Sequence, residues 1–382
     1  MKLALYSNYL NHHQVLITDE LYELLGNEFI FIATLPRDKR ELKGGIDYSD
    51  RPYCILAGED EKAHEKAMQL AREADVCVFG ACSQEYAKAR AINNKRGLSF
   101  EMGERWLKRG WINIFSSHLI KWWFNYMRYF HHKPFYKLCN SAFTATDDRK
   151  LFAYRGRHYK WGYFTAVDDT FKFETSKEDV SNSGTCPHKL MWCSRFLNLK
   201  HPELPIRMAA KLKEKGYWFV LDMYGSGKEE YETKQLAHNL GVDDVVRFHG
   251  ALPNIEILQA MREHEIFLFT SNKFEGWGAV ANEAMTNGCA LVTSDAIGST
   301  PYLVKDGKNG CIFKSGNADS LTKRVEWLIC NPEKKHAIRH EARRTMLDTW
   351  SPSNAAKALL NLIDDLQNNR KCSIKEGPCS EA

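Results

Sequence analysis

The chain has 382 residues, of which 44% are hydrophobic and 26% charged, with a formal net charge of +5. The length suits two domains of common size, and the composition excludes a disordered or fibrous protein. The mild net charge does not favour a nucleic-acid partner. No apolar run approaches 18 residues and the apolar start is short, so we expect neither a membrane-spanning helix nor a secretory leader.

Eleven cysteines are scattered along the chain without a C-x-x-C pair. This usage excludes a zinc ribbon and a thioredoxin-like redox pair, and it is typical of a reducing compartment. We therefore expect a cytoplasmic protein.

In the first half, short β-rich segments alternate with longer segments of helical periodicity, which predicts an α/β fold with mostly parallel strands. Helices are predicted over 13–25 and 63–74, the first ending at Gly26. The predicted strands are 3–6, 29–33, 75–79, 98–101 and 142–145.

A polar stretch over 175–189 interrupts the alternation and predicts a linker. Beyond it the pattern restarts, and the tail after residue 368 is expected to be frayed. Strands are predicted over 190–193, 218–224, 245–248, 266–270 and 291–293, and helices over 207–215, 229–240 and 353–366. Two α/β units in tandem suggest a ligand held between them, at the carboxyl ends of parallel strands.

The segment FEGWGAVANE is the most informative part of the sequence. Glu275 follows an apolar strand and precedes a turn with Gly276 and Gly278, after which a helix is predicted to begin near Ala279. The free N–H groups of such a turn suit a diphosphate, and carboxylates on both sides, Glu275 and Glu283, suit the vicinal diols of a ribose and a hexose. A surface turn and a helix-dipole interaction are the alternative explanation of the two carboxylates.

Two cations follow the predicted strand LMWC, namely Arg195 and Lys200. Arg grips phosphate oxygens bidentately and Lys acts as a point charge, so the pair suits a nucleotide diphosphate. A solvated basic loop is the alternative.

Five motifs in this half, in this order, resemble the nucleotide-sugar-dependent glycosyltransferases of the GT-B fold, specifically the large retaining family 4. They are S-R-x4-K at 194–200, Y-G-S-G at 224–227, F-H-G at 248–250, E-x7-E at 275–283 and D-G-x-N-G at 306–310. The resemblance implies an α/β GT-B fold, with two Rossmann-like domains facing across a cleft. It further implies an acceptor-binding domain over 1–170, a donor-binding domain over 186–350 and a C-terminal crossover helix over 351–368.

The resemblance also implies roles for single residues. Arg195 and Lys200 would bind the donor diphosphate, Glu275 the hydroxyls of the donor sugar and Glu283 the ribose diol, and the first three would be catalytic. The remaining donor-binding residues that it implies are Gly225, Gly250, Leu252, Gly276, Trp277, Gly278 and Ala279.

The N-terminal half departs from the family pattern. The usual Gly-Gly loop after the first strand is replaced by SNYLNHHQ. The C-terminal half departs at one place, where Pro301-Tyr302 occupies the region in which many members carry the Glu of a G-x-x-E element. The N-terminal loop, with F-E-M-G-E-R and W-G-Y-F, resembles a subgroup of bacterial surface-polysaccharide enzymes. We expect an acceptor or phosphate loop, with a surface turn as the alternative for either His; its residues are Asn8, His12, His13 and Glu104.

No D-x-D triplet, which holds a metal in the other major glycosyltransferase fold, and no G-x-G-x-x-G after the first strand occurs in the sequence. We therefore expect no bound metal. We also expect no cofactor, because the nucleotide-sugar is a substrate of the reaction. Arg195 and Lys200 would take the place of the metal.

The segment 105–137 carries seven basic residues, eleven Phe, Tyr or Trp residues and no acidic residue. Such a mixture is typical of a helix lying on an anionic membrane, where a lipid-linked acceptor would be met. The alternative is that the aromatic residues face the core while the charges are solvated. Binding of single-stranded nucleic acid is disfavoured by the low net charge.

The expected function is retaining transfer of a sugar from a nucleotide-sugar, foremost a UDP-sugar, to a glycan or lipid-linked glycan in surface polysaccharide synthesis. One alternative is a nucleotide-sugar epimerase of the same fold, which needs no acceptor. The other is a non-catalytic module that binds a nucleotide or a glycan. We expect a cytoplasmic protein, peripheral at the inner face of the membrane if segment 105–137 touches it.

Overall fold

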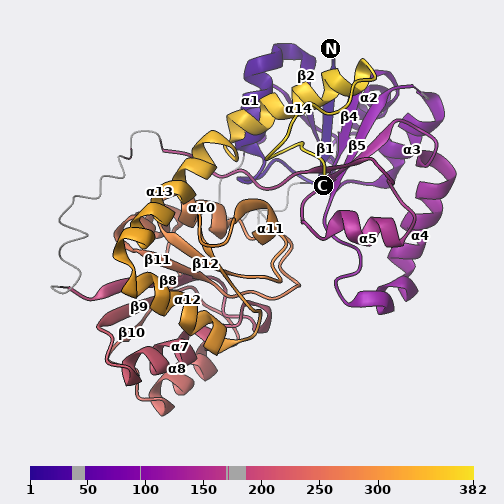
Figure 1. Cartoon of the computed structure of the whole chain (residues 1–382). Helices are drawn as coiled ribbons and strands as arrows, with labels where there is room; N and C mark the ends of the chain where they lie inside the picture. The colour runs from indigo at the N-terminus through magenta and orange to yellow at the C-terminus, as the bar shows by residue number, and fades with distance from the viewer. Residues whose placement is uncertain (37–47, 95, 169–170, 172–185) are drawn as a thin grey trace. The chain divides into compact units, whose positions relative to one another are not determined.

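The computed structural model describes residues 1–36, 48–94, 96–168, 171 and 186–382. The chain divides into two compact units, each with its own sheet (Figure 1). Unit 1 comprises Met1–Thr165 and Thr349–Ala382, and unit 2 comprises Ala166–Asp348. Most of the predicted linker at 175–189 lies outside the described residues.

Unit 1 contains a seven-stranded sheet of order β3-β2-β1-β4-β5-β6-β7, in which all neighbouring strands are parallel. The chain moves outward from β1 to β3 and then returns to β4, so the topology switches between β1 and β4. The strands are β1 (Leu3–Ser7), β2 (Phe29–Ala33), β3 (Cys54–Leu56), β4 (Val76–Phe79), β5 (Leu98–Gly103), β6 (Phe135–Cys139) and β7 (His158–Lys160).

The helices of unit 1 pack on the apolar faces of these strands. They are α1 (Val15–Leu25), α2 (Glu61–Glu73), α3 (Gln84–Asn93), α4 (Ser117–Asn125), α5 (Thr144–Lys150) and α14 (Pro352–Gln367), with short helical turns at Gly26–Glu28, Gly110–Phe115 and Tyr126–Phe130. The yellow α14 lies beside the indigo α1 in Figure 1, and the two helices are in contact. The last helix therefore belongs to unit 1, although unit 2 precedes it in the chain.

Two sequence-based predictions for unit 1 are wrong. The predicted strand at 142–145 is a turn that leads into α5, because the carbonyl oxygen of Ser141 accepts a hydrogen bond from the Thr144 N–H at 3.0 Å. The tail after 368 is not frayed: the Lys160 N–H donates to the carbonyl of Ser380 at 2.8 Å, and Cys379 is fully buried. Backbone pairing beside β7 thus orders a segment whose polar composition predicts disorder.

Unit 2 contains a six-stranded parallel sheet of order β10-β9-β8-β11-β12-β13, with its switch between β8 and β11. Its strands are β8 (His188–Cys193), β9 (Phe219–Tyr224), β10 (Val246–Gly250), β11 (Ile266–Phe269), β12 (Ala290–Ser294) and β13 (Cys311–Phe313). The central strands β11 and β12 are mostly apolar and are buried along their length, as expected where both faces of a parallel sheet are covered, whereas the edge strand β10 has exposed polar residues.

The helices of unit 2 complete the α/β alternation. They are α7 (Glu203–Glu214), α8 (Glu230–Asn239), α9 (Asn254–Glu263), α10 (Val280–Thr286), α11 (Thr300–Leu303), α12 (Ala318–Cys330) and α13 (Pro332–Asp348), with a short turn at Asn198–Lys200. The core between helices and sheet is built around side chains such as Trp192, Leu221 and Ile266. The predicted α/β fold with two parallel, Rossmann-like sheets is confirmed. Among the helices in the described ranges, none combines the length and the apolar character that crossing a membrane requires.

Candidate functional site

The predicted donor-binding residues stand at the carboxyl ends of four neighbouring strands of unit 2. Arg195 and Lys200 follow β8, Gly225 follows β9, Gly250 ends β10 and Glu275 follows β11. Because the carboxyl ends of parallel strands share one edge, these residues gather at the edge where open α/β sheets bind ligands.

Gly225 shows why this edge requires glycine. Its φ is 124°, and its N–H donates to the carbonyl oxygen of Gly250 at 2.6 Å. A Cβ atom at this position would lie 1.9 Å from the carbonyl oxygen of Ser194. Only a residue without a side chain therefore lets the loops after β8, β9 and β10 approach one another.

Lys200 and Glu275, which lie 75 residues apart, form an ion pair whose side chains are 13% and 14% exposed. Two further hydrogen bonds join the same loops. The Asn272 N–H donates to the Leu199 carbonyl at 2.9 Å, and the Thr270 hydroxyl donates to the Lys200 carbonyl at 2.6 Å. Lys200, which is expected to bind the diphosphate, and Glu275, which is expected to bind the sugar, are thus held side by side.

The glycine turn before α10 is packed against β11. Gly278 has a φ of 79°, and a Cβ there would lie 2.2 Å from the ring of Phe269. Trp277 is buried, and its indole N–H donates to the Asn282 side-chain oxygen at 2.9 Å. The Trp277 ring therefore supports the turn from inside. Of the remaining predicted residues, Gly276 is buried, Ala279 precedes α10 and Leu252 is exposed after β10.

Glu283 lies in the first turn of α10 and is reached by Asn254 from the start of α9. The Asn254 amide donates to the Glu283 carboxylate at 3.2 Å, and burial raises the pKa of Glu283. Burial and then the Glu283 charge raise the pKa of Cys193, at the end of β8, to about 12, while Lys200 lowers it. Sequence reasoning missed Asn254. Its position four residues after the F-H-G motif is the only local feature of the sequence that could have pointed to it.

Arg195 is exposed, and it forms no ion pair within the part of the chain that the structure describes. Its guanidinium follows β8 and can therefore accept an anionic ligand without first breaking an internal pair.

The histidine of the F-H-G motif has a structural role. Asp222 on β9 contacts His249 at 2.5 Å and His264 at 3.0 Å. Burial raises the pKa of Asp222, but the hydrogen bonds of the two histidines outweigh it, so that the pKa is lowered overall. The cluster ties β9 to β10 and to the end of α9.

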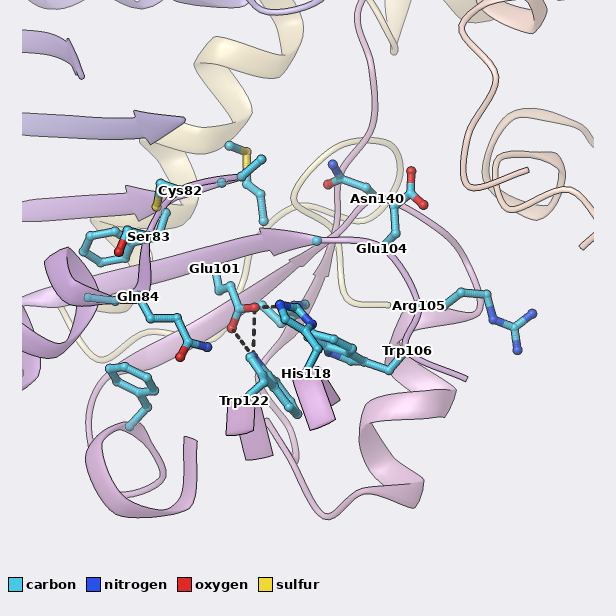
Figure 2. Close-up of a pocket in the computed structure, with 18 of the residues that line it drawn as sticks. Cys82, Ser83, Gln84, Glu101, Glu104, Arg105, Trp106, His118, Trp122 and Asn140 are labelled. Carbon is cyan, nitrogen blue, oxygen red and sulfur yellow. Dashed lines mark hydrogen bonds and ion pairs between the residues drawn. The ribbon is translucent and has the colours of Figure 1, made fainter. Parts of the chain in front are cut away.

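Within unit 1, the predicted loop residues make local contacts. The Asn8 side-chain oxygen accepts the Tyr9 N–H at 2.9 Å, the rings of His12 and His13 lie 3.9 Å apart, and His13 stacks on Tyr163 at 5.3 Å. Glu104 instead lines a pocket of about 650 Å³ at the carboxyl end of β5 (Figure 2). This volume is in the range of small-ligand sites.

Glu101 is the centre of a charged network in the wall of this pocket (Figure 2). Its carboxylate accepts hydrogen bonds from Trp122 Nε1 at 3.1 Å and Lys137 Nζ at 3.0 Å, and from the Tyr154 hydroxyl. Burial lowers the pKa of Lys137, but the charges of Glu101 and Asp148 outweigh this effect and raise it overall. The Glu101 carboxylate is therefore paired within the protein.

Segment 105–137 agrees in part with each of its two explanations, membrane contact and burial of the aromatic residues in the core. Trp122, Tyr126 and Phe130 are buried in the core, and so is Lys137. Six apolar side chains of the same segment are exposed, and we call them together the aromatic patch: Trp111, Ile112, Ile114, Phe115, Ile120 and Phe124.

The comparisons with known proteins agree with the geometry of unit 2. Residues 175–345 match the family of glycosyl transferases group 1. The chain is 31% identical over 152 residues to the putative glycosyltransferase EpsD of Bacillus subtilis (strain 168), covering 40% of this chain and 39% of that protein. It is 24% identical over 174 residues to the lipopolysaccharide core biosynthesis glycosyltransferase LpsE of Rhizobium meliloti (strain 1021), covering 46% and 49%. The chain spans less than half of the length of these curated relatives.

Among solved structures, Anabaena Alr3699/HepE in complex with UDP matches with a TM-score of 0.68 at 17% identity, covering 96% of this chain and 100% of that one. At this identity the likeness shows the fold, which is GT-B. The chain thus carries a group 1 glycosyl transferase domain over residues 175–345, on a GT-B fold.

Proposed function

We propose that the chain is a retaining glycosyltransferase that takes its sugar from a nucleotide-sugar, foremost a UDP-sugar. The observation that carries this proposal is the pairing of Lys200 with Glu275 at the same sheet edge as Arg195 and Glu283. One edge thereby presents two cations for a diphosphate and two carboxylates for two diols. The UDP bound to the similar Anabaena structure supports the choice of nucleotide.

In the proposed reaction, the bond between the anomeric carbon and the diphosphate breaks, and the acceptor oxygen bonds to the same face of that carbon. Arg195 and Lys200 stabilise the negative charge that develops on the leaving diphosphate. Glu275 orients the sugar, and Glu283 holds the ribose. The leaving phosphate takes the proton of the acceptor hydroxyl, so neither a protein nucleophile nor a metal is required, and activity is expected to persist in EDTA.

Unit 1 is the proposed acceptor-binding domain, and the acceptor is a glycan or lipid-linked glycan of surface polysaccharide synthesis. The likeness to LpsE, whose name refers to lipopolysaccharide core biosynthesis, supports this context. The proposed location is cytoplasmic, at the inner face of the membrane.

The donor site is tested by saturation-transfer NMR of the purified protein with UDP-, GDP- and ADP-sugars. We expect one nucleotide class to bind, and Glu283→Ala to weaken it. Glu214→Ala, on an exposed face of α7, serves as the matched control and should bind normally. Absence of binding to every nucleotide by folded protein would overturn the proposal. Conversion of a UDP-sugar to its epimer without acceptor would instead identify an epimerase.

The aromatic patch is the proposed membrane contact. Phe115 is 80% exposed, Ile112 67% and Phe124 62%, and the exposed cations Arg109 and Lys121 lie in the same segment. Apolar side chains beside cations suit a bilayer containing anionic lipid.

Co-sedimentation with vesicles of phosphatidylglycerol and phosphatidylcholine tests this contact. Phe115→Ser should reduce the bound fraction several-fold. Trp218→Ser should not, because this aromatic residue, which is 57% exposed, lies in unit 2. Equal binding of both variants would remove the aromatic patch from the proposal.

A further inference from the structure

His201 connects the loop after β8, which holds Lys200, with the loop after β11, which holds Glu275. It directly follows Lys200 in the sequence and adopts the left-handed conformation, with φ 50° and ψ 56°. A residue other than glycine in this conformation carries backbone strain, and such strain concentrates at functional sites. The side chain is 22% exposed, and each ring nitrogen has a polar partner. Contacts of the ring therefore offset a cost in the backbone.

The turn that carries Glu275 is organised by Asn272. The Asn272 carbonyl accepts the Glu275 N–H at 3.0 Å, and the Asn272 side-chain oxygen accepts the Phe274 N–H at 3.0 Å. The Asn272 N–H itself donates to the Leu199 carbonyl at 2.9 Å. The backbone of Glu275 is therefore placed by a residue whose own position depends on the loop after β8.

These bonds determine which atom of the Asn272 side chain faces His201. A backbone N–H can only donate, so the atom that contacts Phe274 is the amide oxygen. The amide NH2 group then points to the His201 ring, 3.1 Å from Nε2. Because an NH2 group of an amide can only donate, Nε2 of His201 is the acceptor. A neutral imidazole with an accepting Nε2 carries its proton on Nδ1.

Glu203 accepts the hydrogen bond from this Nδ1–H. Its carboxylate lies 2.7 Å from Nδ1, and it belongs to the first turn of α7, where the helix dipole stabilises a negative charge. The tautomer of a histidine is set by the partner of its other nitrogen, so Glu203 prepares Nε2 to accept from Asn272. A proton on Nε2 would place two donors against each other. The Glu203–His201–Asn272 network is thus complete only with the proton on Nδ1.

We propose that His201 is a positioning residue for the donor sugar. Its ring, held by Glu203, fixes the Asn272 amide and thereby the turn that presents Glu275 to the sugar hydroxyls. Because His201 acts through Asn272 and not by touching the sugar or the diphosphate, its loss weakens a UDP-sugar more than UDP. The proposal rests on the proposed function, since it concerns the donor site of that reaction.

Calorimetry of the full chain with UDP and with UDP-glucose tests this role. His201→Phe keeps a ring on the same backbone but removes both hydrogen bonds. It should raise the dissociation constant of UDP-glucose about tenfold, which corresponds to about 1.4 kcal/mol, and that of UDP less than about twofold. His238→Phe is the matched control in unit 2 and should change neither, because its ring contacts Asp243 on an exposed surface.

His201→Gln keeps the proposal testable if His201→Phe does not fold. Its side-chain oxygen can accept from Asn272 in the place of Nε2, so its affinity for UDP-glucose should stay within about threefold of the wild type. NMR of the ring nitrogens in isotope-labelled protein without ligand should show His201 protonated on Nδ1, with the signal assigned by its absence from His201→Gln.

A proton on Nε2 of His201 would overturn the proposal, whatever the affinities. Equal weakening of UDP and UDP-glucose in His201→Phe, or a loss in His201→Gln as large as that in His201→Phe, would overturn it as well. Absence of UDP binding by the folded wild-type protein would instead refute the proposed function. The ring measurement needs no ligand, so failure of the network and failure of the donor site are distinguishable.

Discussion

Breaking the ion pair between Lys200 and Glu275 separates its structural from its functional contribution. The side chains are 13% and 14% exposed, so the pair is intermediate between a surface pair and a fully buried one. Surface pairs contribute about 0–1 kcal/mol, and loss of one partner of a buried pair costs about 3–5 kcal/mol. We therefore expect Lys200→Met and Glu275→Gln each to destabilise unit 2 by about 2 kcal/mol. The double variant should lose less than the sum.

The two substitutions should change the affinities for UDP and UDP-glucose in different ways, although they change stability by similar amounts. Lys200→Met should weaken both UDP and UDP-glucose by roughly tenfold to a hundredfold, since a charge-assisted hydrogen bond contributes about 1.5–3 kcal/mol. Glu275→Gln should weaken UDP-glucose only. UDP itself should bind as tightly as before or more tightly, because Lys200 is released from its internal partner.

Hydrogen exchange of the β8 and β11 amides measures the stability of unit 2, and calorimetry measures the two affinities. The control is the exposed pair Lys215–Glu326, whose removal should change stability only slightly and leave both affinities unchanged. If the double variant regains the wild-type affinity for UDP-glucose, the pair is structural and the assigned roles are wrong.

Three further predictions concern the same unit. Gly225→Ala should cost about 3 kcal/mol of stability and abolish UDP binding, whereas Gly241→Ala, which has open space around it, should still bind UDP; hydrogen exchange and calorimetry test both. The affinity for UDP should fall as the pH drops through the raised pKa of Glu283. Asn254→Ala should move this fall to higher pH in a calorimetric series, because the Asn254 hydrogen bond lowers the pKa of Glu283. An affinity that does not change with pH would contradict the assignment of Glu283 to the ribose. Burial raises the pKa of Glu265, but His188 and Lys335 outweigh this effect and lower the pKa to about 2. About 3 kcal/mol of stability should therefore be present above about pH 5 and lost as the pH falls towards 2. Glu265→Gln should abolish this acid-dependent loss, as measured by hydrogen exchange.

The sequence by itself determined the fold class and the donor edge of unit 2. Alternation of apolar strands with helical segments depends on local periodicity, so it can be read without tertiary information. The common place of Arg195, Gly225 and Glu275 is predictable for the same reason, because they lie in the loops after three strands and the carboxyl ends of parallel strands meet at one edge. Their roles were implied by the family resemblance. Four strands were not predicted: β3, β6, β7 and β13. Three of them, β3, β7 and β13, have only three residues and are too short to show a period.

Only the tertiary structure decided which distant residues meet. The contact of Lys200 with Glu275 and that of Asn254 with Glu283 depend on how separate loops pack, and no local pattern encodes such a pairing. Segment 105–137 has a single composition, yet packing against the sheet buries Trp122 and leaves its neighbours in the aromatic patch exposed. The pocket of unit 1 has the same origin: six strands far apart in the chain end at one edge, and each contributes side chains that have no relation in the sequence.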